Sequence, residues 1–343
     1  MLTTKQKILR RFWHAIIPID ELKSGPKPFR LLGEDMVLFL DADGKPAALR
    51  DRCCHRTSKL SKGWCENGEL VCGYHGWTYR RDGVVTRIPQ LELEPGQPLP
   101  KYKTPSYHCE ARYGYAWVAL EDPIAPIFDI PEERDPKFRR IPQFYSTWHT
   151  ASLRLMENSF DNAHFSFVHK GTFGNQHKPV PGRYKIEETP YGFHAEAVTG
   201  ARNPPSAFPI TGCTEPLIER LLKSDWYLPF GRRFDMHFPS GKRHIIIGYA
   251  TPIEDDKMQM VQFLYRNDKE EDCSAQKLID WDAAIVAEDK EILESTDPDV
   301  MLDEKRIDEA HLPSDRPCLI IRRRLLELLH QHNEQEVTRT AYA

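Results

Sequence analysis

The sequence predicts an α+β protein with two domains, an all-β domain over residues 1–122 and a mixed domain over residues 123–343. Short strand patterns separated by turn signals fill the first third of the chain. An acidic, proline-rich stretch, EDPIAPIFDIPEERDP, follows them and is typical of a linker. Further strand patterns then share the second part of the chain with long helical patterns.

The first domain is predicted to consist of hairpins. The segments MVLFL and PAALR flank the turn DADG within residues 30–50. The segments GELVC and GWTYRRDGVV predict further hairpins, in which RRDG marks a turn. His108–Leu120, HCEARYGYAWVAL, predicts one more strand pair before the linker.

The second domain mixes helices with an antiparallel sheet. Ser152–His169 and Ser274–Ser295 are predicted helices. A last helix begins near residue 314, with Ser314 or Asp315 as its N-cap and Pro317 in its first turn. Between the first two helices, four segments predict strands: GRYKIEETPYGFHAEAVTG, SDWYLPFGRRFDMHFP, RHIIIGYATPI and KMQMVQFLYRN.

Charge and hydropathy exclude several functional classes. The net charge is −4 over 343 residues, so no attraction to nucleic acid or to an anionic membrane is expected. No apolar run approaches the roughly 20 residues of a membrane span, and the N-terminus lacks the pattern of a secretory signal. We therefore expect a cytoplasmic protein. Its eight cysteines are then reduced, which favours metal binding over disulfides.

One cluster of candidate metal ligands lies in the first domain, in RCCHRTSKLSKGWCENGELVCGYHGWTY. The spacing predicts four ligands, Cys53, His55, Cys72 and His75, in the pattern C-x-H followed later by C-x-x-H. Each arm supplies one thiolate and one imidazole, which suits a [2Fe-2S] cluster of the Rieske type. A structural zinc site is the alternative, although zinc fingers usually space their ligand pairs differently.

A second cluster lies in ENSFDNAHFSFVHKG, at the end of the first predicted helix. On a helix, Asp161 and His164 share a face, whereas His164 and His169 point about 140° apart. The two histidines can bind one metal only if the helix ends or bulges between them. We therefore expect His169 just beyond the helix end. Taken alone, either histidine is better explained as a core residue with a hydrogen-bond partner or as a surface residue than as a metal ligand.

A third ligand is predicted on the helix Ser274–Ser295. Its apolar stripe consists of Leu278, Trp281, Ile285, Ile292 and Leu293. Asp289 lies near the middle of this stripe, while Asp282 and Lys290 lie off it. A carboxylate that faces a core needs a cation, either a metal or a buried lysine or arginine. The remaining alternative is that the phase of the stripe is misassigned. Two histidines and one carboxylate form the facial triad of non-haem Fe(II) oxygenases.

These motifs together resemble the Rieske non-haem iron oxygenases. The family pattern C-x-H…C-x-x-H-G-W matches the first cluster and the following Gly76 and Trp77. The pattern N-x-x-D-x-x-H-x₄-H matches Asn158, Asp161, His164 and His169, and the family's late aspartate matches Asp289. The resemblance covers nearly the whole chain, and Cys54 and Cys65 do not match the disulfide pattern of respiratory Rieske proteins. We expect both to be free thiols.

The resemblance implies a helix-grip catalytic domain and a head-to-tail homotrimer. His75 would approach the mononuclear iron of the next subunit, and Asp161 would bridge His75 and His164 by hydrogen bonds. It also implies a terminal oxygenase that takes electrons from an NAD(P)H-dependent reductase, with or without a ferredoxin. The chain itself has no G-x-G-x-x-G motif after a strand.

The expected reaction is monooxygenation: hydroxylation, or N- or O-demethylation, of a small aromatic or heterocyclic substrate. Cis-dihydroxylation is the alternative, and an electron-transfer protein with a degenerate second site is a further one. Substrate contacts are harder to predict. Candidates for the pocket are Phe160, Trp226, Phe230, Met236 and Phe263. Candidates for binding a substrate carboxylate are Arg202, Arg232 and Arg233, although each is equally explained as a surface charge.

Overall fold

The computed structural model describes residues 1–94, 97–303 and 309–339. The chain divides into two units, one formed by Lys7–Ile127 and the other by Met1–Gln6 together with Phe128–Ala343. The first unit is built from strands and short 3-10 turns, and the second combines an antiparallel sheet with helices. The predicted fold class, an all-β N-terminal part followed by an α+β part, is confirmed.

Within its described residues, the first unit contains a six-stranded sheet and a four-stranded sheet. The larger sheet has the order β1-β10-β9-β4-β3-β2 and comprises β1 (His14–Pro18), β2 (Lys27–Leu31), β3 (Glu34–Leu40), β4 (Pro46–Arg50), β9 (Ser106–Arg112) and β10 (Tyr115–Ala119). The smaller sheet has the order β5-β6-β7-β8 and comprises β5 (Trp64–Glu66), β6 (Glu69–Val71), β7 (Thr78–Tyr79) and β8 (Val85–Arg87). The predicted DADG hairpin forms because Asp41 accepts hydrogen bonds from the N–H groups of Asp43 and Lys45.

One apolar cluster joins the small sheet to β3 and β4. Val37, Phe39 and Leu49 pack in it with Leu70 and Tyr79. The cluster also contains the buried thiols Cys53 and Cys72 and the ring of Trp77. The loops that carry the predicted cluster ligands are therefore anchored in the core of the unit.

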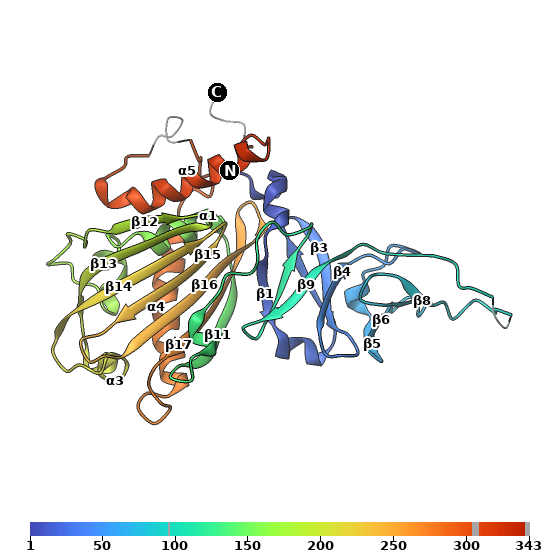
Figure 1. The fold of residues 1–343 in the computed structure, drawn as a ribbon, viewed down its shortest axis with the longest axis horizontal. Helices are drawn as coiled ribbons and strands as arrows, with labels where there is room; N and C mark the ends of the chain where they lie inside the picture. The colour runs from blue at the N-terminus through green and yellow to red at the C-terminus, as the bar shows by residue number, and fades with distance from the viewer. Residues whose placement is uncertain (95–96, 304–308, 340–343) are drawn as a thin grey trace. The chain divides into compact units, whose positions relative to one another are not determined.

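The second unit is built on a seven-stranded antiparallel sheet in the order β11-β17-β16-β15-β14-β13-β12, counted over the described residues. Its strands are β11 (Arg139–Trp148), β12 (Lys185–Thr189), β13 (Gly192–Arg202), β14 (Leu217–Tyr227), β15 (Gly231–His237), β16 (Arg243–Glu254) and β17 (Lys257–Arg266). Its α-helices are α1 (Ser152–Phe160), α2 (Phe165–Val168), α3 (Phe208–Thr211), α4 (Ala275–Leu293) and α5 (Arg316–Gln331). Figure 1 shows α4 running across one face of this sheet, and α1 contacts α4, α5 and strands β15 and β16.

The ends of the two long helices follow from their sequences. The side chain of Ser274 caps α4 by accepting a hydrogen bond from the N–H of Lys277. Asp315 is the N-cap of α5, as one of the two predicted alternatives, but its side chain instead accepts from the N–H of Leu312. Pro317 lies in the first turn of α5, where its missing N–H costs nothing.

The prediction of one continuous helix over Ser152–His169 is wrong. Helix α1 ends at Phe160, and Asp161 has an extended backbone with φ −90° and ψ 120°. The Asp161 side chain accepts a hydrogen bond of 2.6 Å from the N–H of Ala163, which replaces helical bonding with a local turn. Helix α2 then begins after His164, and His169 follows the last residue of α2 as expected.

The strand β11 was not predicted. Its residues come directly after the proline-rich stretch, and Pro142 interrupts the strand pattern. In the structure β11 pairs with β17, and Pro142 lies at a bulge where the register shifts between Pro142 and Phe144. A bulge tolerates the missing N–H, so the strand continues through the proline.

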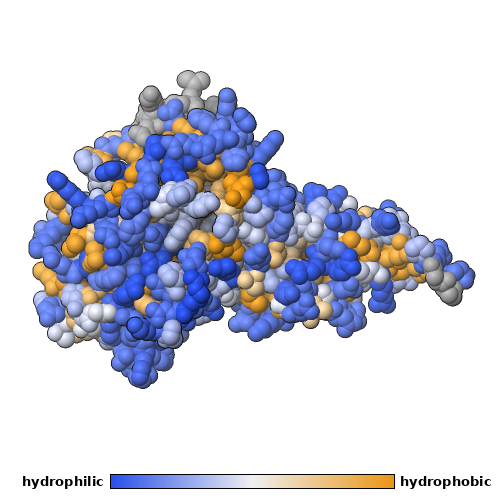
Figure 2. Space-filling view, viewed as in Figure 1, coloured by the Kyte–Doolittle hydropathy of each residue, from blue (hydrophilic) through white to orange (hydrophobic). Residues whose placement is uncertain are grey.

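The surface shown in Figure 2 is mostly hydrophilic, with apolar residues in small scattered groups. Among the described helices, none combines the length and the apolar character that crossing a membrane requires.

Candidate metal centres

The two loops that carry the first cluster of ligands have the same backbone geometry. The N–H of Cys53 donates to the carbonyl of Ser58, and the Cys53 carbonyl accepts from the N–H of Thr57. The second loop repeats this pattern: the N–H of Cys72 donates to Trp77, and the Cys72 carbonyl accepts from Gly76. Thr57 and Gly76 both have positive φ angles, 58° and 71°. Each loop thus turns in the same way after its cysteine.

The four side chains of these loops fit a [2Fe-2S] cluster of the Rieske type. Cys53 and Cys72 are buried, and the ring centroids of His55 and His75 lie 4.7 Å apart. Trp77 stacks on His55 at 4.6 Å and fixes its orientation. Among the described residues, no protein group bonds the buried Nδ1 of His55. Such an atom requires a partner, which a metal ion provides.

Tyr79 is a functional candidate that the sequence analysis missed. Its hydroxyl oxygen lies 2.9 Å from Sγ of Cys53 and 3.4 Å from Sγ of Cys54. The same oxygen accepts a hydrogen bond from the N–H of Cys54, so its proton is available to a sulfur atom. Hydrogen bonds to ligand sulfurs tune the potential of iron–sulfur clusters. In the sequence, the sign of this role was a tyrosine placed two residues after the Gly-Trp pair.

The cysteines that are surplus to the ligand set remain free. Cys54 is exposed and Cys65 is half-buried, and both are free thiols in the structure. All eight cysteines of the chain lie in the described residues and none forms a disulfide there. Burial raises the pKa of the Cys72 thiol, and the neighbouring Cys53 raises it further.

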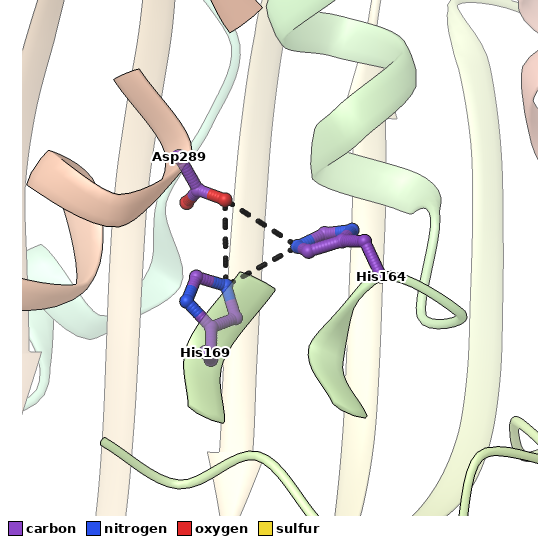
Figure 3. Close-up of side chains that lie close together, drawn as sticks. All are labelled: His164, His169 and Asp289. Carbon is purple, nitrogen blue, oxygen red and sulfur yellow. Dashed lines mark hydrogen bonds and ion pairs between the residues drawn. The ribbon is translucent and has the colours of Figure 1, made fainter. Parts of the chain in front are cut away.

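The second unit brings together His164, His169 and Asp289 (Figure 3). The Nε2 atoms of the two histidines are 3.2 Å apart. Oδ1 of Asp289 lies 3.4 Å from Nε2 of His164 and 3.3 Å from Nε2 of His169. Three donor atoms therefore converge on one point, although the histidines come from the α1–α2 segment and the carboxylate comes from α4.

A second layer of side chains orients these three residues. Nδ1 of His169 donates to Oε2 of Glu288 at 2.9 Å, and Thr172 donates to the same oxygen. The amide of Asn158 donates to Oδ1 of Asp289 at 3.2 Å. Carboxylates behind metal-bound histidines fix the tautomer so that the other nitrogen faces the metal. The sequence analysis missed Glu288, whose position next to Asp289 was the only signal.

Asp161 lies behind His164. Its Oδ2 is 3.4 Å from Nδ1 of His164, which is otherwise a buried atom without a hydrogen-bond partner among the described residues. The structure therefore brings Asp161 next to His164, but through the turn between α1 and α2 rather than on a shared helix face. The carboxylate also borders a second depression, lined by Arg154, His311 and Cys318 among others.

The electrostatics of these residues match a cation site. Burial alone would lower the pKa of His164, but Asp161 and Asp289 outweigh this effect and raise it to about 9. Burial alone would raise the pKa of Asp289, but His164 and His169 hold it well below its usual range. The carboxylate is therefore ionised, and the donor set of two imidazoles and one carboxylate fits non-haem iron(II).

A cavity of about 850 Å³, including its open mouth, adjoins the three donor atoms. Most of the lining is apolar: Phe165, Phe173, Phe234, Phe238, Ile246 and Trp281. Of the predicted pocket residues only Met236 lines it. The other four are buried core residues away from the cavity: Phe160, Trp226, Phe230 and Phe263.

The predicted arginines have different environments. Arg202 and Arg232 line the cavity. Arg233 does not, because its guanidinium forms ion pairs with Glu132, Asp225 and Asp235. Arg220, which the sequence analysis did not name, also lines the cavity and is buried.

The predicted apolar stripe of α4 is partly wrong. Ile292 is 46% exposed, whereas Asp282, expected off the stripe, is buried. Oδ2 of Asp282 accepts hydrogen bonds from Nε2 of Gln143 at 2.6 Å and from Nε2 of His244 at 3.0 Å. Asp282 thereby ties α4 to β11 and β16 at the wall of the cavity. Its partners are distant in sequence, so local periodicity gives no sign of them.

Comparison with known protein families agrees with both sites. Residues 12–103 match the Rieske [2Fe-2S] domain. Residues 148–331 match the vanillate O-demethylase oxygenase C-terminal domain. The first match contains all four cluster candidates, and the second contains all three donors of the other site.

Relatives of known function align with this chain over nearly the full length of both proteins. The chain is 28% identical to the methylxanthine N1-demethylase NdmA of Pseudomonas putida over 97% of this chain and 93% of the relative. The structure of that enzyme with caffeine has a TM-score of 0.82 at 27% identity and covers 96% of this chain and 94% of the other. Dicamba monooxygenase bound to dicamba shares the fold, with a TM-score of 0.80 at 21% identity over 95% and 98% of the two chains.

Proposed function

Because this chain belongs to the Rieske non-haem iron oxygenases, in the branch with the vanillate O-demethylase type of catalytic domain, we propose that it oxidatively demethylates a small N- or O-methylated aromatic or heterocyclic compound. The convergence of His164, His169 and Asp289 beside an apolar cavity supports this proposal. So does the similarity over nearly the full length to a methylxanthine N1-demethylase. Cis-dihydroxylation of a ring is the alternative outcome.

The proposed net reaction is a monooxygenation. One C–H bond of the methyl group breaks and a C–O bond forms to one atom of O₂, while the other oxygen atom leaves as water. Two electrons and two protons complete the balance. The resulting hydroxymethyl group on nitrogen or oxygen then breaks off as formaldehyde, and the substrate keeps an N–H or O–H group.

In this proposal the chain holds two metal groups. Cys53, His55, Cys72 and His75 hold the [2Fe-2S] cluster, and its buried anchoring fixes their loops. His164, His169 and Asp289 hold the iron. When bound, the two groups together supply electrons for the activation of O₂.

The surrounding residues position the ligands and keep water out. Glu288 accepts the Nδ1 proton of His169, which leaves the lone pair of Nε2 directed at the site. Asn158 holds one oxygen of Asp289. The apolar side chains of the cavity wall exclude water and favour a flat, apolar substrate body.

The electron supply is also part of the proposal. Since the sequence contains no dinucleotide-binding motif, an NAD(P)H-dependent reductase, directly or through a ferredoxin, delivers the electrons. The chain acts as a head-to-tail homotrimer, in which His75 of one subunit lies near His164 of the next. Asp161 accepts hydrogen bonds from both imidazoles and connects them.

The proposal is tested by electron paramagnetic resonance of the anaerobically reduced holoenzyme with nitric oxide, which binds open ferrous sites. We expect a high-spin iron–nitrosyl signal beside the Rieske signal. Methoxybenzoates and N-methylated heterocycles are then added, and one class should change the nitrosyl signal and yield formaldehyde on turnover. A Rieske signal alone in fully iron-loaded protein would contradict the oxygenase and leave an electron carrier. A cis-diol product without formaldehyde would establish the alternative.

The role of Asp161 is tested separately by Asp161→Asn. An amide has one acceptor oxygen and no charge, so it cannot accept equally from two imidazoles. Both metal signals should remain, while oxidation of the reduced cluster in a single turnover slows by at least about tenfold, the size expected for a connecting hydrogen bond. Loss of the metals, or an unchanged rate, would contradict this role.

A further inference from the structure

The inner face of strand β14 carries a charged side chain among apolar ones. Arg220 lies between Ile218 and Leu222, the alternate residues of the strand that share its face, and both belong to an apolar cluster of the second unit. Arg220 is only 6% exposed and lines the cavity beside the three donor residues. The buried face of a strand normally carries apolar residues, so an arginine at this position calls for an explanation.

Within residues 1–94, 97–303 and 309–339, Arg220 forms no ion pair with a carboxylate. Its polar contacts are long, 3.4 Å to Oγ1 of Thr199 and 3.6 Å to the sulfur of Met236. Burial lowers the pKa of Arg220 to about 10, so the side chain stays cationic at neutral pH. A buried cation without a paired anion is costly and is retained where it serves a purpose. The other buried arginines of the described residues all have acidic partners: Arg233 with Glu132, Arg266 with Asp268, and Arg322 with Glu157.

Two aromatic rings connect Arg220 to the histidine donors. The guanidinium carbon lies 4.3 Å from the ring centroid of Phe173 and 5.7 Å from that of Phe165. The ring of Phe173 in turn lies 4.7 Å from that of His169, and the ring of Phe165 lies 4.9 Å from that of His164. Aromatic rings attract a cation and orient it, but they do not neutralise it. A single layer of aromatic side chains therefore separates the charge from the two histidines.

This arrangement places the charge of Arg220 within reach of a metal at the donor atoms. The contacts through Phe173 limit the distance between the guanidinium carbon and the ring centroid of His169 to about 9 Å, over which a charge in a protein interior still acts strongly on an ion. Two further arginines line the cavity, but solvent screens their charges more, because Arg202 is exposed and Arg232 is half-buried.

The sign of the effect follows from the charge of the ion. A nearby positive charge disfavours ferric iron more than ferrous iron, because the ferric ion carries one more positive charge. Carboxylates have the opposite effect, and three of them surround the donor atoms: Asp289 among the donors, Glu288 behind His169 and Asp161 behind His164. Arg220 contributes a buried positive charge on the cavity side, which offsets part of this negative charge.

We propose that Arg220 raises the reduction potential of the iron bound by the three donor residues and thereby keeps this iron ferrous. The inference rests on the proposed function, because it concerns the same iron. The step that Arg220 influences is a one-electron reduction: ferric iron takes up one electron from the reduced [2Fe-2S] cluster and becomes ferrous. No bond to Arg220 forms or breaks. A higher potential makes this uptake more favourable, and ferrous iron is the state that oxygenases with this donor set use.

The test is an anaerobic redox titration of the iron-loaded holoenzyme, in which electron paramagnetic resonance follows the high-spin ferric signal. Arg220→Met removes the charge and suits the apolar surroundings. At a fixed solution potential we expect its ratio of ferrous to ferric iron to fall about tenfold, which corresponds to a potential lower by about 59 mV. Arg220→Gln, a polar neutral variant, should show a fall of similar size. Arg220→Lys keeps the charge and should retain most of the wild-type potential.

Two further variants separate the charge from its surroundings. Lys223→Gln is the matched control, because Lys223 lies on the same strand but is half-buried and pairs with Glu196 at 3.1 Å. Its removal should leave the potential of the iron unchanged. Phe173→Leu removes a ring contact and keeps the charge of Arg220. Its potential should lie closer to that of the wild type than the potential of Arg220→Met does.

Iron affinity distinguishes an effect of charge from damage to the fold. Competition with a ferrous chelator measures this affinity. Loss of a repelling charge should leave ferrous iron bound as tightly as in the wild type, or more tightly. A merely structural role of Arg220 predicts the opposite, because loosened histidines bind a metal more weakly. We therefore expect Arg220→Met to combine a lower potential with undiminished iron binding.

The outcomes separate this inference from the proposed function. An unchanged or higher potential in both Arg220→Met and Arg220→Gln would overturn the role of the charge and leave the oxygenase intact. An equal fall of the potential in Arg220→Lys would do the same, and so would weaker iron binding at an unchanged potential. Failure of the proposed function shows instead in the wild type, as a missing nitrosyl signal in protein that is fully loaded with iron.

Discussion

In the proposed holoenzyme, single hydrogen bonds to the ligand atoms tune the properties of each metal group. Tyr79 is such a case, because its hydroxyl group contacts the sulfur atoms of Cys53 and Cys54. A donated hydrogen bond disperses negative charge on a thiolate and so favours the reduced cluster.

We expect Tyr79→Phe to lower the reduction potential of the cluster. Loss of a hydrogen bond of about 1 kcal/mol corresponds to on the order of 50 mV for a one-electron couple. Protein-film voltammetry measures this shift. Tyr107→Phe is the control, because the Tyr107 hydroxyl bonds Glu34 and does not contact the cluster loops. A potential that is unchanged or higher in Tyr79→Phe would contradict the proposed donor.

At the candidate iron site, Glu288 orients a proposed ligand, His169, by a hydrogen bond. We expect Glu288→Gln to weaken iron binding by about 10- to 100-fold, because the charge that orients His169 is lost. Competition with a ferrous chelator measures the affinity. Glu291→Gln on the exposed side of α4 is the control and should bind iron like the wild type. If both variants lose iron equally, the loss does not come from the contact with His169.

The sequence patterns predicted the candidate metal ligands better than they predicted the side chains that orient those ligands. The spacing of Cys53 and His55 has few other uses, whereas His164 and His169 became candidate ligands only together with Asp289 and the family resemblance. Glu288 and Tyr79 have ordinary neighbours in the sequence, and their roles depend on contacts that form only in the fold. Arg220 was missed for the same reason, since an arginine within a strand is usually a surface residue.

At the scale of elements, the break between α1 and α2 creates the candidate iron site. A continuous helix would point His164 and His169 about 140° apart. The turn at Asp161 and the short helix α2 bring their Nε2 atoms to 3.2 Å instead. The sequence indicated that some break was necessary but not where it lies, because the turn depends on the Asp161 side chain competing with helical bonding.

The attachment of α4 to the sheet gives an element-scale prediction. Asp282→Leu leaves the donors of His244 and Gln143 without their buried acceptor, which should cost roughly 3 kcal/mol. The melting temperature of the second unit should fall by several degrees. Asp282→Asn keeps one acceptor oxygen, so its melting temperature should lie between those of the wild type and Asp282→Leu.

Asp280→Asn is the control for this series, because Asp280 is exposed on the same helix and accepts from Gln276 alone among the described residues. It should melt like the wild type in calorimetry. A melting temperature of Asp282→Leu equal to that of the control would mean that the contacts of Asp282 contribute nothing to the attachment of α4.

At the scale of the whole molecule, His14 links stability to pH. It is completely buried in β1, and burial lowers its pKa from 6.5 to about 4. The unfolded chain therefore binds a proton more readily than the folded chain, so stability is lost as the pH falls from about 6.5 towards 4. The loss at pH 5 should be about 2 kcal/mol.

Urea unfolding at pH 7 and pH 5 measures this dependence. His14→Gln should lose less stability than the wild type between these pH values, because glutamine does not titrate. His108→Gln, which changes an exposed histidine of the same unit, should keep the wild-type dependence. A wild-type dependence in His14→Gln would show that other groups cause it.

The order of strands and helices along the whole chain was largely predictable, because each has its own periodicity. Elements whose patterns are interrupted were not, as Pro142 within β11 illustrates. The phase of α4 was also misjudged, because Asp282 is buried through partners more than 35 residues away in the sequence. Long-range contacts of this kind leave no local trace.

The separation of the proposed iron ligands along the chain has one more consequence. His169 and Asp289 are about 120 residues apart, and the strands β12–β17 all lie between them. A metal ion held by both residues therefore closes a long loop, in the manner of a staple. It restricts the unfolded chain more than a short loop would. If iron binds here as proposed, it would restrain the chain that forms the sheet, and its removal should lower the stability of the second unit.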